Sequence, residues 1–163
     1  MSNIHFKTTH SWSAAREMLA FDPLKPEYTA GLRLHCLRIH VCATSCVSFR
    51  LAIRTLEAHF GDFVISQANK GEAEARRLAL DIRYGSDCTE ALIAGRPARV
   101  FEVGPEPEPD DIDGRSPSVV TWNDAGMFYL IASDRMFVAE LVQIAHSLYA
   151  IGQRSRRSAR RRD

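Results

Sequence analysis

Hydrophobic residues alternate with polar ones in several short stretches, and a period of two is typical of half-buried β-strands. Residues 56–60 follow this alternation, Gly61-Asp62 suits a tight turn, and residues 63–65 resume the hydrophobic face. Glycine at the first turn position allows the positive φ of a type II′ turn, so we predict a hairpin here. Residues 32–41 change hydrophobic parity midway, which predicts a strand with a bulge or with both faces partly covered. Residues 47–53 are hydrophobic but aperiodic, which fits irregular structure or a strand.

Two further hairpins are predicted in the second half of the chain. Residues 91–103 carry a hydrophobic run on each side of Gly95-Arg96-Pro97, and the proline should stiffen this turn. In the clearest hairpin, residues 119–122 and 127–133 flank the turn sequence 123–126.

A short helix is predicted near the N-terminus. Ser11 precedes a stretch of good helix formers and can accept a hydrogen bond from a free N–H of the first turn. The helix should end near Phe21, because Pro23 and Pro26 lack an N–H and disfavour helical geometry in the preceding residue.

A second helix is predicted from about residue 135 to residue 151, with Ser133 or Asp134 as its cap and Gly152 as its stop. The residues expected to pack on a sheet are Phe137, Leu141, Ile144, Ala145 and Leu148. Residues 69–80 are rich in Glu, Ala and Arg, which fits either a surface helix or a charged loop that leads into a strand near residues 80–84.

Three hairpins without regular strand–helix alternation predict an α+β fold. We expect an antiparallel sheet of about six to seven strands, with the N-terminal and C-terminal helices packed on one face. A chain of 163 residues with 45% hydrophobic content suits one domain, which we place at residues 1–152.

Residues 153–163 form a basic tail that we expect to be disordered, because it has too few hydrophobic residues to offset its ordering entropy. The last ten residues hold six arginines and one aspartate, so 15 basic and 19 acidic residues remain of the 21 and 20 in the chain. The rest of the chain is therefore acidic, with a charge of −4. Residues 104–117, GPEPEPDDIDGRSP, should form an exposed acidic loop.

The chain lacks a signal-like N-terminus and any hydrophobic run of the roughly 20 residues that cross a bilayer, so we expect a cytoplasmic protein without membrane contact. Its cysteines, Cys36, Cys42, Cys46 and Cys88, are then expected to be reduced. Cys36, His40 and Cys42 share one face of an ideal strand, but their spacing does not match a closed zinc site. We therefore predict no metal and no cofactor.

The order of features resembles one bacterial family. The resemblance rests on four stretches: FDPLKPEY at residues 21–28, the Gly-Arg-Pro-Ala turn at 95–98, VVTWNDAGMFYL at 119–130, and the helix from Glu140 to Leu148. Together they are similar to the uncharacterised domain on the outer side of bacterial anti-sigma-type and sporulation membrane proteins. The resemblance implies the α+β fold and a regulatory role, and it implies no catalytic residue.

We accordingly expect a non-enzymatic binding or regulatory domain that binds a protein partner. The residues predicted to contact a partner or ligand are Glu57, His59, Trp122, Tyr129, Asp110, Asp111 and Asp113. One alternative is a nucleic-acid accessory protein that binds phosphates through Arg154, Arg156, Arg157, Arg160, Arg161 and Arg162. The other is a small enzyme that uses Cys or His near residues 32–42 together with Glu57 and His59.

Overall fold

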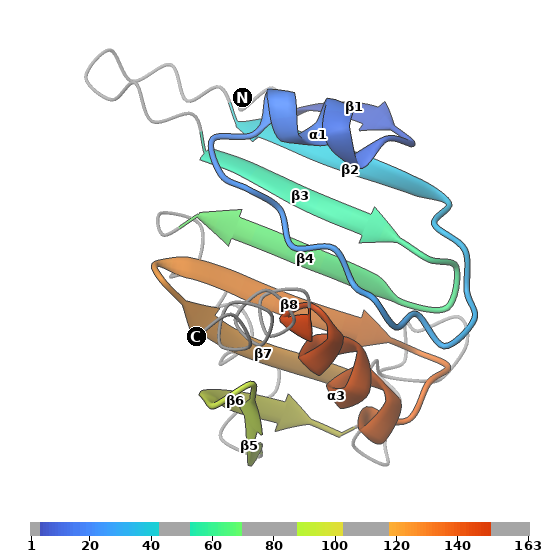
Figure 1. Cartoon of the computed structure of the whole chain (residues 1–163), viewed down its shortest axis with the longest axis vertical. Helices are drawn as coiled ribbons and strands as arrows, with labels where there is room; N and C mark the ends of the chain where they lie inside the picture. The colour runs from blue at the N-terminus through green and yellow to red at the C-terminus, as the bar shows by residue number, and fades with distance from the viewer. Residues whose placement is uncertain (1–3, 43–52, 70–87, 103–117, 151–163) are drawn as a thin grey trace, which may run out of the picture.

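The computed structural model describes residues 4–42, 53–69, 88–102 and 118–150. These residues form one antiparallel sheet of eight strands in the order β1-β2-β3-β4-β8-β7-β6-β5, with two helices (Figure 1). The strands are β1 Ile4–Thr9, β2 Cys36–Cys42, β3 Ile53–His59, β4 Val64–Asn69, β5 Thr89–Ile93, β6 Arg96–Phe101, β7 Ser118–Asp124 and β8 Met127–Ser133. The helices are α1 Trp12–Met18 and α3 Val138–Ser147. The α+β prediction is confirmed in these coarse terms.

Both helices lie on the same face of the sheet, which we call the front face; the opposite face is the back face (Figure 1). The chain between α1 and β2 also crosses the front face, over β3 and β4. Gln67 of β4 is completely buried and fixes this crossing, because its side chain accepts from the Leu24 N–H at 2.8 Å and donates to the Leu24 carbonyl at 2.6 Å. The front face is thus covered by two helices and one pinned connection.

The main hydrophobic core lies between the sheet and this cover. Strand alternation directs Leu37, Ile39, Leu56, Ile65 and Ile131 to the front face, where all five are fully buried. From the helices, the same core receives Ala15 of α1 and Leu141, Ile144 and Ala145 of α3, followed by Leu148. The prediction that the C-terminal helix packs on the sheet is confirmed for Leu141, Ile144, Ala145 and Leu148.

All three predicted hairpins are present. The first turns at Gly61, which has the expected positive φ of 86°. The other two turn at Ala94-Gly95 and Ala125-Gly126, where both residues have positive φ, as in a type I′ turn. The prediction that Pro97 lies in the second turn is wrong, because Pro97 belongs to β6 and pairs with Leu92 of β5.

The sheet has more strands than predicted. β1, which pairs with β2, was not anticipated, because only ten residues precede the helix cap and they show no long pattern. β2 begins at Cys36 rather than Leu32, and its register with β3 is unbroken over seven residue pairs. The strand contains no bulge. The hydrophobic alternation changes parity because residues 32–35 precede the strand.

The helices are shorter than predicted. Ser11 caps α1 as expected, with its hydroxyl accepting from the Ala14 N–H, but the helix ends at Met18. Residue 137 is the N-cap of α3 and its side chain is 81% exposed, so the prediction that Phe137 packs on the sheet is wrong. The proposed cap Ser133 instead accepts from Arg135 N–H and Met136 N–H one turn earlier.

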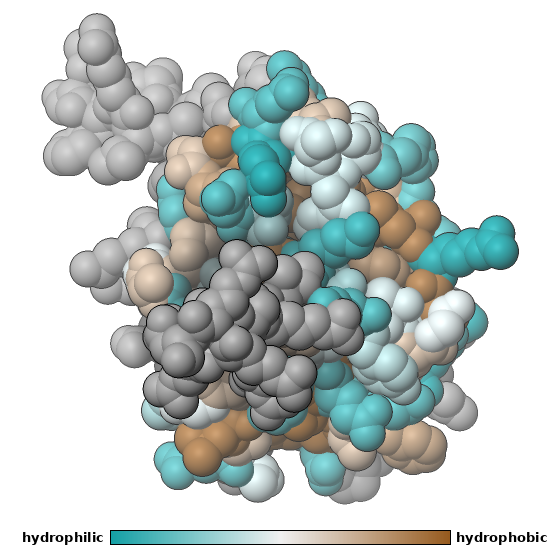
Figure 2. Space-filling model, viewed as in Figure 1, coloured by the Kyte–Doolittle hydropathy of each residue, from teal (hydrophilic) through white to brown (hydrophobic). Residues whose placement is uncertain are grey.

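The surface seen from the helix side mixes hydrophilic and hydrophobic residues (Figure 2). Among the described residues, no helix is long and apolar enough to cross a membrane. The predictions for residues 47–52, 69–80 beyond Asn69, 80–84, 104–117 and 153–163, and for Gly152 as a stop, lie outside the described residues.

Candidate functional site

The back face of the sheet carries several polar and charged residues. Cross-strand register places Arg38, Glu57 and Ser66 in one row across β2, β3 and β4, because Arg38 pairs with Glu57 and Glu57 with Ser66. The same register continues through β8 and β7 to Arg99 and Glu90, which pair with each other on β6 and β5. A row of polar and charged positions, interrupted by Leu130 on β8, therefore crosses this face.

A groove of about 690 Å³ lies on the back face across β5, β6, β7 and β8. We call it the β5–β8 groove. It is lined by Glu90, Ala91, Leu92, Pro97, Ala98, Arg99, Thr121, Trp122, Asn123 and Phe128. Its volume falls in the range of roughly 300–1,000 Å³ that is usual for ligand pockets. The floor is hydrophobic, because Phe128 is only 2% exposed and packs with Ala68 and Leu130 in a second, smaller core.

The rim of the groove combines an exposed hydrophobic side chain with charges. Leu92 is 64% exposed, one of the largest exposures of a large hydrophobic residue in the described chain. Glu90 lies on the same face of β5 and is exposed. Arg99, its register partner, is engaged elsewhere: its Nε donates to Cys88 Sγ at 3.3 Å and its guanidinium lies 4.9 Å from the Phe101 ring centre. This mixture suits recognition of an amphipathic ligand.

Two histidines share one carboxylate on the other half of the back face. Glu57 Oε2 lies 3.1 Å from His40 Nε2 and 3.4 Å from His59 Nε2. His40 Nε2 is close enough to Glu57 for an ion pair, but this buried nitrogen makes no well-aligned hydrogen bond. Each of the three side chains keeps about a quarter of its surface exposed. The predicted neighbours Glu57 and His59 are therefore in contact, and His40 joins them.

Cys36 adds a thiol to this part of the sheet, since it pairs with His59 in the register of β2 and β3. Four positions separate Cys36 from His40, about 13 Å along a strand, so these two side chains do not converge on one point. Within the described part of the chain, no group of three His, Cys, Asp or Glu side chains could hold a metal ion. The side chain of Cys42 and all of Cys46 lie outside that part.

The predicted contact residues Trp122 and Tyr129 lie in the front core instead of on the surface. They are register partners on β7 and β8, and their rings stack with centroids 5.2 Å apart. Trp122 Nε1–H donates to the Tyr149 hydroxyl at 2.8 Å, and Trp122 is also one of the residues that line the β5–β8 groove. The exposed fractions of Trp122 and Tyr129 are 2% and 5%, so their first role is to pack the region under the end of α3.

A salt bridge closes this aromatic cluster. Arg96 lies 4.0 Å above the Tyr149 ring centre and places Nε 2.7 Å from Asp124 Oδ2. The contact with Asp124 raises the pKa of Arg96 further. Burial raises the pKa of Tyr129 and of Tyr149 above the ordinary range of tyrosine. The charges therefore hold the two hairpin ends together, and both phenols stay neutral at physiological pH.

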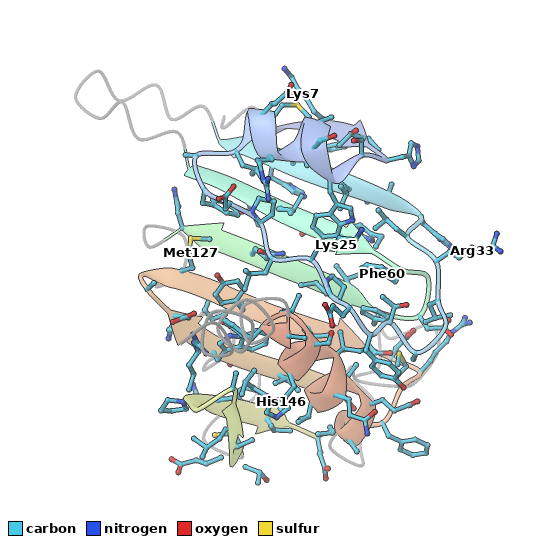
Figure 3. All side chains as sticks on the ribbon, viewed as in Figure 1. Lys7, Lys25, Arg33, Phe60, Met127 and His146 are labelled. Atoms are coloured by element: carbon cyan, nitrogen blue, oxygen red, sulfur yellow. The ribbon has the colours of Figure 1, made fainter. Side chains whose placement is uncertain are left out.

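The end of α3 is also tied to the β5–β6 hairpin. His146, labelled in Figure 3, accepts a hydrogen bond at Nδ1 from the Ala94 N–H of the turn, 3.2 Å away. This hydrogen bond connects the end of α3 with the β5–β6 hairpin, which also lines the β5–β8 groove.

A second cavity, of about 530 Å³, lies on the front face between α1, residues 22–25 and the end of α3. It is lined by Trp12, Leu24 and Tyr149 among others.

The remaining predicted contacts, Asp110, Asp111, Asp113 and the six tail arginines, lie outside the described residues. Sequence reasoning did not identify the groove residues on β5 and β6. The available signal was Leu92, a hydrophobic residue in a hairpin strand, but the sheet order that leaves it exposed at an edge requires tertiary pairing.

A comparison of the chain with profiles of known protein families, with curated proteins and with solved structures finds no match.

Proposed function

We propose that this chain is a non-enzymatic regulatory domain that binds a protein partner through the β5–β8 groove. The observation that supports this proposal is the groove itself. It measures about 690 Å³ and lies on the sheet face away from the helices, with a buried Phe128 at its floor and an exposed Leu92 at its rim. Exposed hydrophobic side chains rimmed by polar groups are typical of interaction sites. Thr121 and Asn123, which also line the groove, supply hydrogen-bonding groups that can fix the orientation of a partner.

Affinity purification of the tagged full-length chain from its own cells tests the proposal. An Asn123→Arg variant places a long charged side chain at the groove, whereas Gln143→Arg makes the same amide-to-arginine change on the exposed side of α3. We expect a co-purifying protein that is reduced at least tenfold by Asn123→Arg and retained by Gln143→Arg. Equal recovery with all three chains would refute the groove as the binding surface.

A small Cys/His-dependent enzyme is the first alternative, and the register pairing of Cys36 with His59, which contacts Glu57, favours it. A thiol, an imidazole and a carboxylate in this order suit nucleophilic catalysis. Neither of the two cavities described above is lined by Cys36, His59 or Glu57. The geometry therefore supports a partner-binding role more strongly than an enzymatic one. Labelling by a thiol-directed electrophile that Glu57→Gln slows at least tenfold would favour the enzyme.

The arginine-rich tail supports a second alternative, a sequence-independent nucleic-acid accessory role. Six arginines among the last ten residues can neutralise several phosphates and release their counterions, which gives salt-sensitive binding. Truncation after Gln153 tests it. Nucleic-acid binding at low salt by the full chain, absent from a truncated chain with the same melting temperature, would support this role.

A further inference from the structure

We infer that the partner of the β5–β8 groove presents an extended segment that adds to the sheet beside β5, with a hydrophobic residue and a basic residue two positions apart. This inference rests on the proposed function and specifies the chemistry of its partner. In such strand addition, backbone hydrogen bonds supply affinity while alternate side chains supply specificity.

The first argument is the position of β5. It lies at the end of the sheet order, and among the described residues it pairs only with β6. Within the described part of the chain, its opposite edge is unpaired and presents backbone donors and acceptors, which is the template that an added strand requires. β5 has five residues, enough for the short backbone ladder of a bound peptide.

The second argument identifies which backbone groups point outward. A two-residue turn at Ala94-Gly95 makes Ile93 and Arg96 the closing hydrogen-bonded pair, and hydrogen-bonded pairs then alternate along the hairpin. Leu92 consequently occupies a non-hydrogen-bonded pair with Pro97, which suits a proline because it has no N–H to donate. The N–H and C=O of Leu92, and by the same alternation those of Glu90, point away from β6.

The third argument is that these two residues also form the groove rim. Both Glu90 and Leu92 line the groove, and their side chains lie on the same face of β5 because they are two positions apart. A strand paired with them places its own alternate side chains beside theirs. A hydrophobic residue next to Leu92 covers its 64% exposed surface and extends the hydrophobic part of the groove rim.

The charge of Glu90 determines which residue the added strand should carry two positions from its hydrophobic residue. Glu90 is exposed, and its register partner Arg99 contacts Cys88 and Phe101. A lysine or arginine of the added strand opposite Glu90 provides a counter-charge, whereas an acidic residue there is repelled. An acidic main body, with a charge of −4 over residues 1–153, favours the same basic partner.

Two synthetic peptides, Ac-TTLTKTT-NH2 and Ac-TTLTETT-NH2, test this chemistry on the full-length chain by amide NMR and hydrogen exchange. The order Leu-Thr-Lys matches antiparallel pairing with Leu92 and Glu90. We expect the lysine peptide to slow exchange at the amides of Glu90 and Leu92 and to bind about twofold to fivefold more tightly than the glutamate peptide, as expected for an exposed ion pair. Glu90→Lys should reverse this preference.

Leu92→Pro and Leu92→Ala separate the backbone contribution from that of the side chain. Proline removes the outward N–H at a position where the internal ladder does not use it, whereas alanine keeps the N–H. We expect Leu92→Pro to weaken the lysine peptide about tenfold more than Leu92→Ala does. Equal effects, or no slowed exchange at Glu90 and Leu92, would overturn strand addition.

The remaining outcomes distinguish this inference from the proposed function. Peptide-induced shifts confined to Asn123 and Phe128 would leave the groove as the binding surface and overturn the β5 edge. A concentration-dependent dimer that Leu92→Pro abolishes would assign the edge to a second copy of the chain and also overturn it. Partner recovery that is insensitive to Asn123→Arg would refute the groove itself, whatever the peptides do.

Discussion

The front and back faces of the sheet differ in how their residues relate to folding. On the front face, Leu37, Ile39, Leu56 and Ile65 are fully buried, and helix α3 adds Leu141 and Ile144 to the same core. On the back face, the small core of Ala68, Phe128 and Leu130 and the buried pair Phe101 and Val119 lie among polar and charged residues. The front face is explained by the burial of hydrophobic surface.

Charged groups on the back face need another explanation. A partly exposed carboxylate between two imidazoles, as at Glu57, contributes little to folding compared with a buried hydrophobic side chain. The exposed Leu92 contributes even less, because it leaves most of its surface in water. The back face is itself partly buried, since Phe101 and Val119 are 1% and 2% exposed, so only its exposed positions such as Leu92 and Asn123 are available for binding. This difference predicts how substitutions at buried and at exposed positions of the two faces behave.

The largest effect is expected for Leu141→Ala on the front face. Leu141 is completely buried in the core, so removing its side chain should lower the free energy of unfolding by about 2–5 kcal/mol. Chemical denaturation followed by circular dichroism measures the change. Phe137→Ala on the same helix end is the control, and a loss above about 0.5 kcal/mol there would contradict the assigned exposure.

A smaller loss is expected where Gln67 fixes the chain crossing. Gln67→Met keeps the length of the side chain but removes both hydrogen bonds to Leu24, which should lower the free energy of unfolding by about 1–3 kcal/mol. Gln143→Met, at an exposed position of α3, is the matched control. Equal stability of the two variants would show that the crossing is not held by Gln67.

The aromatic cluster makes stability depend on alkaline pH. Burial raises the pKa of Tyr129 and Tyr149 in the folded chain, whereas both titrate near pH 10 in the unfolded chain. Above about pH 10 the unfolded state therefore binds fewer protons, and stability falls as pH rises, by up to about 1.4 kcal/mol per pH unit for each tyrosine. Stability curves between pH 8 and 11 measure this slope.

Tyr129→Phe should make the alkaline slope shallower than that of the unsubstituted chain, because it removes one of the two phenols whose pKa burial raises. An identical slope in the two chains would show that Tyr129 does not titrate with unfolding.

The smallest effect on stability is expected on the back face. Asn123 is exposed at the groove, so Asn123→Arg should change the free energy of unfolding by no more than about 0.5 kcal/mol while it weakens partner binding. Thermal melting of the purified variants measures this. A large loss of stability would mean that Asn123 supports the fold, and the contrast between the two faces would fail there.

Local sequence patterns predicted the hairpins and the buried side of α3, because alternation and turn residues are read within a few positions. They placed the Ala125-Gly126 turn within residues 123–126 and gave the correct core positions Leu141, Ile144 and Leu148. The extra strand β1 and the exposure of Phe137 depend on pairing and packing with distant segments. For the same reason the contact of Glu57 with His59 followed from strand periodicity, whereas the groove required the order of the sheet.

Site-specific photocrosslinking in living cells tests the central claim most directly. A photoreactive benzoyl-phenylalanine in place of Asn123 lies at the β5–β8 groove, and the same residue in place of Gln143 lies on the exposed side of α3. We predict a discrete crosslinked protein adduct from position 123 that position 143 does not give. An adduct from position 143 with none from position 123 would place the partner on the front face and contradict the account.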